Sequence, residues 1–203
     1  MTVGRGTAQG GPSGDSFYMD WTTAWEEAGM FAVFSHGNSG PRCGTAGSPG
    51  EFESVIAVTA VDSEDSLASF SSRGPGTNAT GFSVNKPDLS APGVDIRSAT
   101  STFNSQNDAN YAVNSGTSMA APHVSGVAAL ALSINPSLTV TQLRELVKTA
   151  VDQNDVPPDN GRGGIGQDEC GGIRYDVFPN YHYGTGRINA VKAVEAALAL
   201  RKA

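Results

Sequence analysis

A serine at the start of a long apolar segment is the clearest candidate for a reactive group in this sequence. Residues 116–126 read GTSMAAPHVSG, so small apolar residues follow Ser118. The pattern predicts a helix that begins beside the serine, with Thr117 as its N-cap. The free N–H groups of a first helical turn, together with the helix dipole, favour negative charge above them. This placement favours acyl transfer, in which a serine oxygen attacks a carbonyl carbon.

A side-chain amide is the second candidate. Asn38 lies in the segment HGNSG, directly after the apolar run at residues 30–34, which we interpret as a buried strand. An amide in such a tight, Gly-flanked turn can donate a hydrogen bond to a developing oxyanion. It can equally be an ordinary turn residue, because asparagine tolerates left-handed backbone. The residues alone leave both roles open.

The elements that must position these residues have the pattern of an α/β protein. Helical periodicity and capping signals predict helices at residues 19–28, 117–135, 139–150 and 190–200. Apolar runs predict buried strands at residues 30–34 and 55–61, and we expect short strands at residues 67–72 and 94–98. Residues 111–114 lead into the helix that begins beside Ser118. Residues 152–183 are rich in Gly, Pro, Asn and Asp, and we expect a long surface excursion there.

Charge and hydropathy exclude several classes of protein. The net charge of −7 and the pI near 4.8 argue against a nucleic-acid partner. The uncharged run at residues 117–135 approaches membrane-spanning length, but Pro122, His123 and Gly126 interrupt it. We therefore expect a buried core helix there and no membrane partner. The first residues carry no apolar stretch of the kind found in a signal peptide.

Several segments, in order along the chain, resemble those of one protease family. GTSMAAPHVSG is similar to the nucleophile motif of the subtilisin-like serine proteases, and GNSG is similar to their oxyanion loop. The resemblance continues through SPGEFESVIAVTAVD, LASFSSRGP, KPDLSAPGVDI and YGTGRINAVKAV, and it covers about residues 10–200. Both cysteine-containing loops resemble those of secreted bacillopeptidase-like members. The chain thus resembles the C-terminal half of a subtilase catalytic domain.

The resemblance implies a fold and a domain organisation. The family has a three-layer α/β/α architecture with a mostly parallel sheet. We expect this fold to be incomplete here, because the strands and helix that come first in the family are missing from the sequence. One partial peptidase domain then occupies residues 1–203, with no second domain and with one sheet edge left unpaired.

The resemblance also implies roles for individual residues. Ser118 matches the nucleophile and Asn38 the oxyanion donor, while Ser35, His36 and Gly37 match the strand end that pairs with the substrate backbone and lines the first specificity pocket. The family's catalytic aspartate and histidine, in DTG-like and HGTH-like motifs, precede the matched part. Neither motif occurs in this chain.

The three histidines are poor substitutes for the absent base. His123 follows Ser118 by five residues, about 140° around the helix axis, and we expect it to face away from the nucleophile. His36 lies beside the oxyanion loop, at a position where the family has a small residue. We expect His182, in a polar loop, to be solvated. The chain alone is therefore expected to be proteolytically inactive or nearly so.

A weak cation site is a further implication of the resemblance, although no cofactor is required. In the family, the carbonyls that match Gly50, Phe52 and Val55 hold Ca²⁺ or Na⁺ together with the carboxylate that matches Asp88. Oxygen ligands suit such hard cations. The alternative is that Asp88 is a turn or salt-bridge residue beside Lys86.

The cysteines and one sequon bear on the compartment. Cys43 and Cys170 form either a disulfide or two incidental thiols. Asn78 begins an Asn-Ala-Thr sequon, which can be glycosylated in a eukaryotic secretory pathway. By resemblance, we expect a secreted protein.

The sequence therefore predicts a serine endopeptidase acting on peptides or proteins, with the N-terminal segment of the domain as its necessary partner. The alternative is a non-catalytic subtilase-like protein that binds peptides or protease inhibitors. A serine esterase of the α/β-hydrolase type is disfavoured. Those enzymes use GxSxG, and Ala120 stands where the last glycine would be.

Overall fold

A computed structural model of the chain describes residues 2–4, 17–77, 83–100, 110–153 and 169–202. Its centre is a six-stranded sheet with the order β1-β2-β3-β6-β12-β9. The strands are Thr2–Gly4 (β1), Ala32–Ser35 (β2), Ile56–Val61 (β3), Leu89–Pro92 (β6), Val151–Asp152 (β9) and Arg187–Ile188 (β12). All neighbouring pairs run parallel except β12 and β9.

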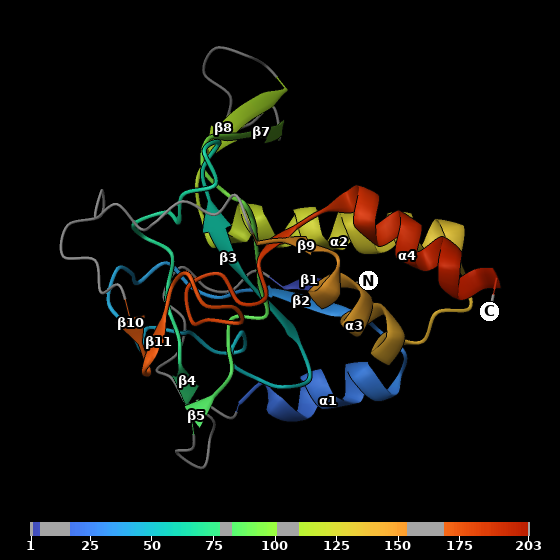
Figure 1. The fold of residues 1–203 in the computed structure, drawn as a ribbon, viewed down its shortest axis with the longest axis horizontal. Helices are drawn as coiled ribbons and strands as arrows, with labels where there is room; N and C mark the ends of the chain where they lie inside the picture. The colour runs from blue at the N-terminus through green and yellow to red at the C-terminus, as the bar shows by residue number, and fades with distance from the viewer. Residues whose placement is uncertain (1, 5–16, 78–82, 101–109, 154–168, 203) are drawn as a thin grey trace.

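Helices cover both faces of this sheet (Figure 1). Helix α1 (Met19–Glu27) lies below the sheet in that view, whereas α2 (Thr117–Ile134) and α4 (Ala190–Lys202) lie above it. Helix α3 (Val140–Thr149) packs against α2 and α4. Every residue of β2 and β3 is buried, as expected for parallel strands covered on two sides. The predicted three-layer α/β/α fold with a mostly parallel sheet is confirmed.

Helix α2 forms the centre of the core. Small side chains on its buried face allow close packing against the sheet, among them Ala120, Ala121 and Ala128, each without exposed surface. Its mean hydropathy of 1.3 and its 18 residues are enough to span a membrane by length and composition. Its contacts with β2, β3, β6 and α4 instead make it a core helix, as predicted.

Two capping predictions agree with the structure. Thr139 and Gln142 form a reciprocal capping box at the start of α3. Asn189 caps α4, because its Oδ1 accepts hydrogen bonds from the backbone N–H groups of Val191, at 2.9 Å, and Lys192, at 3.1 Å.

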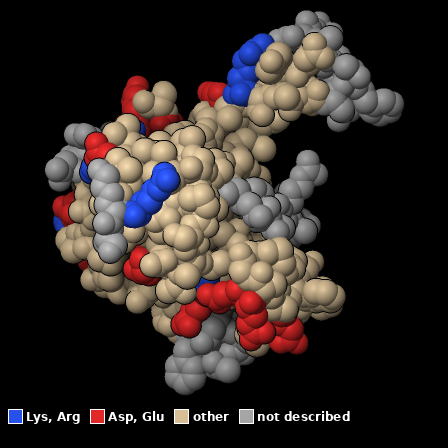
Figure 2. All heavy atoms as spheres, turned by 90° about the vertical axis from the view of Figure 1, so that its right-hand side faces the viewer, with Lys and Arg blue, Asp and Glu red and all other residues tan. Residues whose placement is uncertain are grey.

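Two strand predictions need correction. Residues 67–72 do not form a strand: Leu67 makes an isolated bridge to Val61, and the chain then turns. The strand predicted at residues 94–98 lies at Ile96–Ala99 (β7) and pairs with Tyr111–Asn114 (β8) in an antiparallel hairpin outside the main sheet. Figure 2 shows this hairpin standing clear of the body. Most of its residues are exposed, including the apolar side chains of Tyr111 and Val113, so neither face of the hairpin is buried against a helix.

Two short antiparallel pairs complete the described structure. They are Gly76–Thr77 (β4) with Ser83–Val84 (β5), and Glu169–Cys170 (β10) with Ile173–Arg174 (β11). A disulfide joins Cys43 and Cys170, whose Cα atoms lie 5.5 Å apart, so the segment that follows Asn38 is tied to β10. Asn78 lies outside the described residues.

Candidate active site

Ser118 is the second residue of α2, and its side chain is half-buried. The predicted cap is wrong in one respect: Thr117 is the first helical residue rather than the N-cap. Gly116 occupies the N-cap position and offers no side chain. The cap comes instead from a residue 79 positions earlier, because the N–H of Thr117 donates to Oδ1 of Asn38 at 3.0 Å.

Thr117 also fixes the orientation of the Asn38 amide. Its hydroxyl donates to Oδ1 of Asn38 at 2.8 Å and accepts a bond from the N–H of Gly37 at 3.3 Å. Thr117 itself has no exposed surface. Since the oxygen of the amide is held on one side, its Nδ2 points the other way, and a Cβ built on Gly116 would lie 3.5 Å from it. The amide donor therefore lies directly beside the residue that precedes Thr117 and Ser118.

Two hydrogen-bond donors remain available at this place. Within the described part of the chain, the N–H of Ser118 has no acceptor, as is usual in a first helical turn. The Nδ2 group of Asn38 is the other donor, on an exposed side chain. Both donors lie near Gly116, at the positive end of an 18-residue helix, and such N–H groups can stabilise an oxyanion formed on a bound acyl group.

The histidines do not complete this arrangement. His36 has no exposed surface, and among the described residues neither of its ring nitrogens has a hydrogen-bond partner. Burial, together with the nearby charge of Lys86, lowers its pKa to about 3. His123 Nδ1 lies 2.9 Å from the carbonyl oxygen of Met119, one turn back on α2.

The prediction for His182 is wrong. Its side chain is fully buried rather than solvated, and its Nε2 lies 3.7 Å from Sγ of Cys170. The ring of Tyr175 packs edge-on against it at 6.5 Å between centroids. The polar composition of this loop indicated solvent, but the disulfide and an aromatic ring enclose the imidazole.

The strand end proposed for substrate binding is largely used within the chain. The N–H of His36 donates to Val58 and its carbonyl accepts from Gly47. The N–H and carbonyl of Gly37 are bonded to Thr117 and Ser72. The backbone groups of His36 and Gly37 are thus bonded to β3 and to neighbouring loops, and their pairing with a substrate backbone stays a prediction. A lining role for Ser35, His36 and Gly37 stays a prediction.

The residues predicted for a cation are not arranged to receive one. The ammonium of Lys86 donates to the carbonyl of Val55 at 2.7 Å and to Oδ2 of Asp88 at 2.5 Å. Burial lowers the pKa of Lys86 and the carboxylate of Asp88 acts against this. Of the four predicted ligands, Gly50, Phe52, Val55 and Asp88, the ion pair therefore takes two, and they do not fit Ca²⁺ or Na⁺. Asp88 is instead a salt-bridge residue that pairs with Lys86, which was the alternative prediction.

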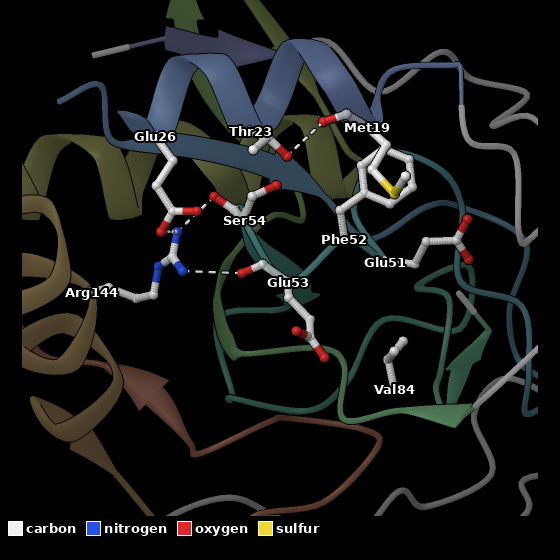
Figure 3. A pocket seen from close by; sticks show the side chains of 9 residues that line it. All are labelled: Met19, Thr23, Glu26, Glu51, Phe52, Glu53, Ser54, Val84 and Arg144. Carbon is white, nitrogen blue, oxygen red and sulfur yellow. Dashed lines mark hydrogen bonds and ion pairs between the residues drawn. The ribbon is translucent and has the colours of Figure 1, made fainter. Parts of the chain in front are cut away.

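A hollow of about 450 Å³ lies away from Ser118 (Figure 3). It is bounded by α1, by the turn at residues 51–54 and by Arg144 of α3. Arg144 pairs with Glu26 at 3.0 Å and donates to the carbonyls of Glu53, at 3.1 Å, and Ser54, at 2.6 Å. These bonds join α3 to α1 and to the turn, and Ser118 is not among the residues that line the hollow.

Comparison with known proteins decides the family. The chain matches the family model described as "Subtilase family" over residues 1–168. This chain belongs to the subtilase family. The matched range includes Asn38, Thr117 and Ser118.

Individual relatives match different shares of this subtilase chain. Serine protease AprX from Bacillus subtilis (strain 168) is 43% identical over 145 residues, which are 64% of this chain and 32% of the relative. Bacillopeptidase F from the same organism is 35% identical over 198 residues, 92% of this chain and 12% of the relative. The solved structure of Sphericase aligns with a TM-score of 0.69 at 28% identity, covering 93% of this chain and 56% of its own. The chain therefore spans between about an eighth and just over half of these proteins.

Proposed function

We propose that this chain supplies the nucleophile and the oxyanion donors of a serine endopeptidase. Ser118 would attack the scissile carbonyl of a bound peptide or protein and form an acyl-enzyme. The oxygen of that carbonyl would then accept hydrogen bonds from the N–H of Ser118 and from Nδ2 of Asn38. Membership of the subtilase family supports this reaction class.

The observation that carries the proposal is the hydrogen-bonded link between Asn38 and Thr117. It places an amide from the end of β2 beside the N-terminus of α2, although the two residues are 79 positions apart. A capping role needs only the oxygen of Asn38 and would leave its NH₂ group without purpose. Here the oxygen accepts two bonds from Thr117, so the NH₂ group faces Gly116, two residues before Ser118.

Catalysis by this site requires a general base from polypeptide outside residues 1–203. His36 is buried, His123 is bonded to its own helix and His182 is enclosed beside Cys170. In a serine hydrolase, a nucleophile without its base retains only about 10³–10⁴-fold acceleration over water from oxyanion stabilisation and binding. We therefore expect residues 1–203 alone to hydrolyse peptides at no more than this level.

A chimera tests the proposal. Residues 1–203 would replace the matching part of AprX, so that the remaining polypeptide of that protease supplies what lies outside this chain. We expect hydrolysis of a chromogenic peptide, and Ser118→Ala should abolish it. Ser125→Ala is the matched control, because Ser125 lies on the same helix and is buried away from the site.

A folded chimera that cleaves no peptide would overturn the proposal. Peptide or inhibitor binding that is unchanged in Ser118→Ala would then favour the non-catalytic alternative. Full activity in the Ser118→Ala chimera would show that another residue is the nucleophile.

The proposed compartment is extracellular. The supporting observation is the disulfide between Cys43 and Cys170, since disulfides persist in oxidising compartments. Export of the natural protein, followed by mass analysis of the Cys43 and Cys170 peptides before and after reduction, tests this assignment.

A further inference from the structure

The turn at residues 50–55 presents its carbonyl oxygens to positively charged side chains of the same chain. Three successive carbonyls each accept a bond from a cationic group: those of Glu53 and Ser54 from Arg144, and that of Val55 from Lys86. Figure 3 shows the guanidinium of Arg144 reaching the turn from α3. These oxygens are the kind of ligand that a hard metal cation uses.

Lys86 lies at the inner side of this turn. Its side chain is 4% exposed, and its ammonium joins the carbonyl of Val55 to the carboxylate of Asp88. The same carboxylate oxygen accepts a bond from the N–H of Ala57 at 2.7 Å, and the N–H of Asp88 donates to the carbonyl of Ala57 at 3.0 Å. The ammonium thus connects the turn to strand β3 and to the start of β6.

The charge balance at this place leaves no room for a second cation. Oδ2 of Asp88 lies 2.5 Å from one ammonium, which balances the charge of the carboxylate. A divalent ion at the same oxygens would face the positive charge of Lys86 at close range in a buried setting, where like charges repel strongly. It would also need several further oxygens to complete its coordination.

We propose that the ammonium of Lys86 takes the place of a metal cation at the 50–55 turn. Because this charge belongs to the chain itself, the stability of the turn does not depend on Ca²⁺ or Na⁺. Removing the lysine side chain exposes the carbonyl of Val55 and the carboxylate of Asp88 to solvent ions. The vacated position then becomes a cation site.

The position of the turn gives this device a structural role. A Cβ built on Gly50 would lie 2.6 Å from the carbonyl oxygen of Ser35 and 3.4 Å from Cα of His36, so the turn packs directly on the end of β2. The N–H of Gly47 also donates to the carbonyl of His36. The ammonium of Lys86 therefore stabilises the layer on which the segment leading to Asn38 rests.

Thermal unfolding of the intact chain in three buffers of equal ionic strength tests the proposal. The buffers contain EGTA with tetramethylammonium chloride, CaCl₂, or NaCl. We expect the wild-type midpoint to be the same in all three. Lys86→Ala should lower the midpoint in EGTA by about 6 °C or more, because it leaves a buried carboxylate unpaired. CaCl₂ or NaCl should then raise it again.

Two matched variants make the response specific. Lys148→Ala removes a lysine of α3 whose ammonium bonds Glu145, and it should create no cation response. Asp88→Asn in the Lys86→Ala background should abolish the response that the single variant gains. Lys86→Ser serves as a second variant with the same expectation as Lys86→Ala.

Either of two results overturns the proposal. One is a wild-type midpoint that rises in CaCl₂ or NaCl above its value in EGTA. The other is a folded Lys86→Ala or Lys86→Ser chain whose thermal unfolding midpoint is the same in EGTA, CaCl₂ and NaCl. Failure of both variants to fold in every buffer also contradicts it, because the cation should replace the ammonium. Folding of a variant only when CaCl₂ or NaCl is present supports it.

Discussion

The start of helix α2 and the turn at residues 50–55 differ in how their polar groups are paired. At the helix, the backbone N–H of Ser118 and the side-chain NH₂ group of Asn38 are available to a ligand, and solvent reaches both residues. At the turn, the carbonyls of Glu53, Ser54 and Val55 and the carboxylate of Asp88 accept hydrogen bonds from Arg144 and Lys86.

The helix start presents donors to a ligand, as the proposed function requires, whereas the groups of the turn are paired within the fold. Unpaired donors cost stability when buried, so they are kept where a substrate or water can satisfy them. The paired charges of the turn are valuable only while both partners are present. Substitutions at the turn should therefore change the free energy of unfolding more than substitutions at the helix start.

The largest loss of stability is expected at the ion pair of Lys86 and Asp88, which holds the 50–55 turn. Asp88→Ala leaves the ammonium of Lys86 buried without its carboxylate and the N–H of Ala57 without its acceptor. We expect the free energy of unfolding to fall by about 3–5 kcal/mol, measured by urea denaturation at neutral pH. A loss under about 1 kcal/mol would mean that the pair is solvated. Substitutions at the turn would then affect the free energy of unfolding no more than substitutions at the helix start.

Acid should destabilise the same layer through His36. Its pKa is about 3 when folded and near 6.5 when unfolded, so the unfolded chain binds the extra proton between these values. Stability is therefore complete above about pH 6.5 and falls as the pH is lowered, by at most about 1.4 kcal/mol per unit. We expect about 2 kcal/mol to be lost between pH 6.5 and pH 5.

Comparison with His36→Ala isolates this contribution. The variant should show a flatter dependence of the unfolding free energy on pH over that interval. Asp152, whose pKa is held at about 2 chiefly by a hydrogen bond from Lys192, contributes only at lower pH and is common to both proteins. Equal slopes in the two proteins would contradict the buried, neutral state of His36.

A smaller effect is expected where Thr117 holds the oxyanion amide. Thr117→Val keeps the shape of the side chain but removes the bonds to Oδ1 of Asn38 and from the N–H of Gly37. We expect a loss of about 1–2 kcal/mol in unfolding free energy. Thr59→Val is the control: the Thr59 hydroxyl is buried with no partner among the described residues, so its removal should cost nothing. Equal losses in both variants would refute the anchoring role of Thr117.

The smallest change in stability, and the clearest separation of roles, is expected at Asn38. Asn38→Ala removes the cap of α2 and should cost about 1 kcal/mol. Asn38→Asp keeps an acceptor for Thr117 and should leave stability nearly unchanged, since aspartate caps as well as asparagine. In the AprX chimera both variants should lose about 10²–10³ in turnover, the cost measured for such a donor in a subtilisin. Retained turnover in Asn38→Asp would show that the amide donates nothing.

Local patterns in the sequence predict many of the helices and strands of this fold. The apolar runs of β2 and β3, the periodicity of α3 and the caps at Thr139 and Asn189 were predictable, because each depends on neighbouring residues. The hairpin of β7 and β8 was not, since its strands pair only with one another and most of their residues, apolar ones included, are exposed.

The candidate site depends on long-range contacts that local patterns do not contain. Ser118 and Asn38 were predictable from their motifs, but the bond that joins Asn38 to Thr117 spans 79 positions. The burial of His182 was missed because packing, not composition, encloses it. Lys86 did carry a signal, because it stands two residues from Asp88 and the salt-bridge alternative already paired the two.

Covalent labelling of residues 1–203 by a fluorophosphonate tests the central claim most directly, because the probe reports an activated serine without the need for a substrate pocket. The purified chain should label Ser118 only at the slow rate of an unassisted serine, whereas the AprX chimera should label rapidly and in one-to-one stoichiometry. Rapid stoichiometric labelling of the chain alone, abolished by Ser118→Ala, would contradict the claim that its base comes from outside residues 1–203.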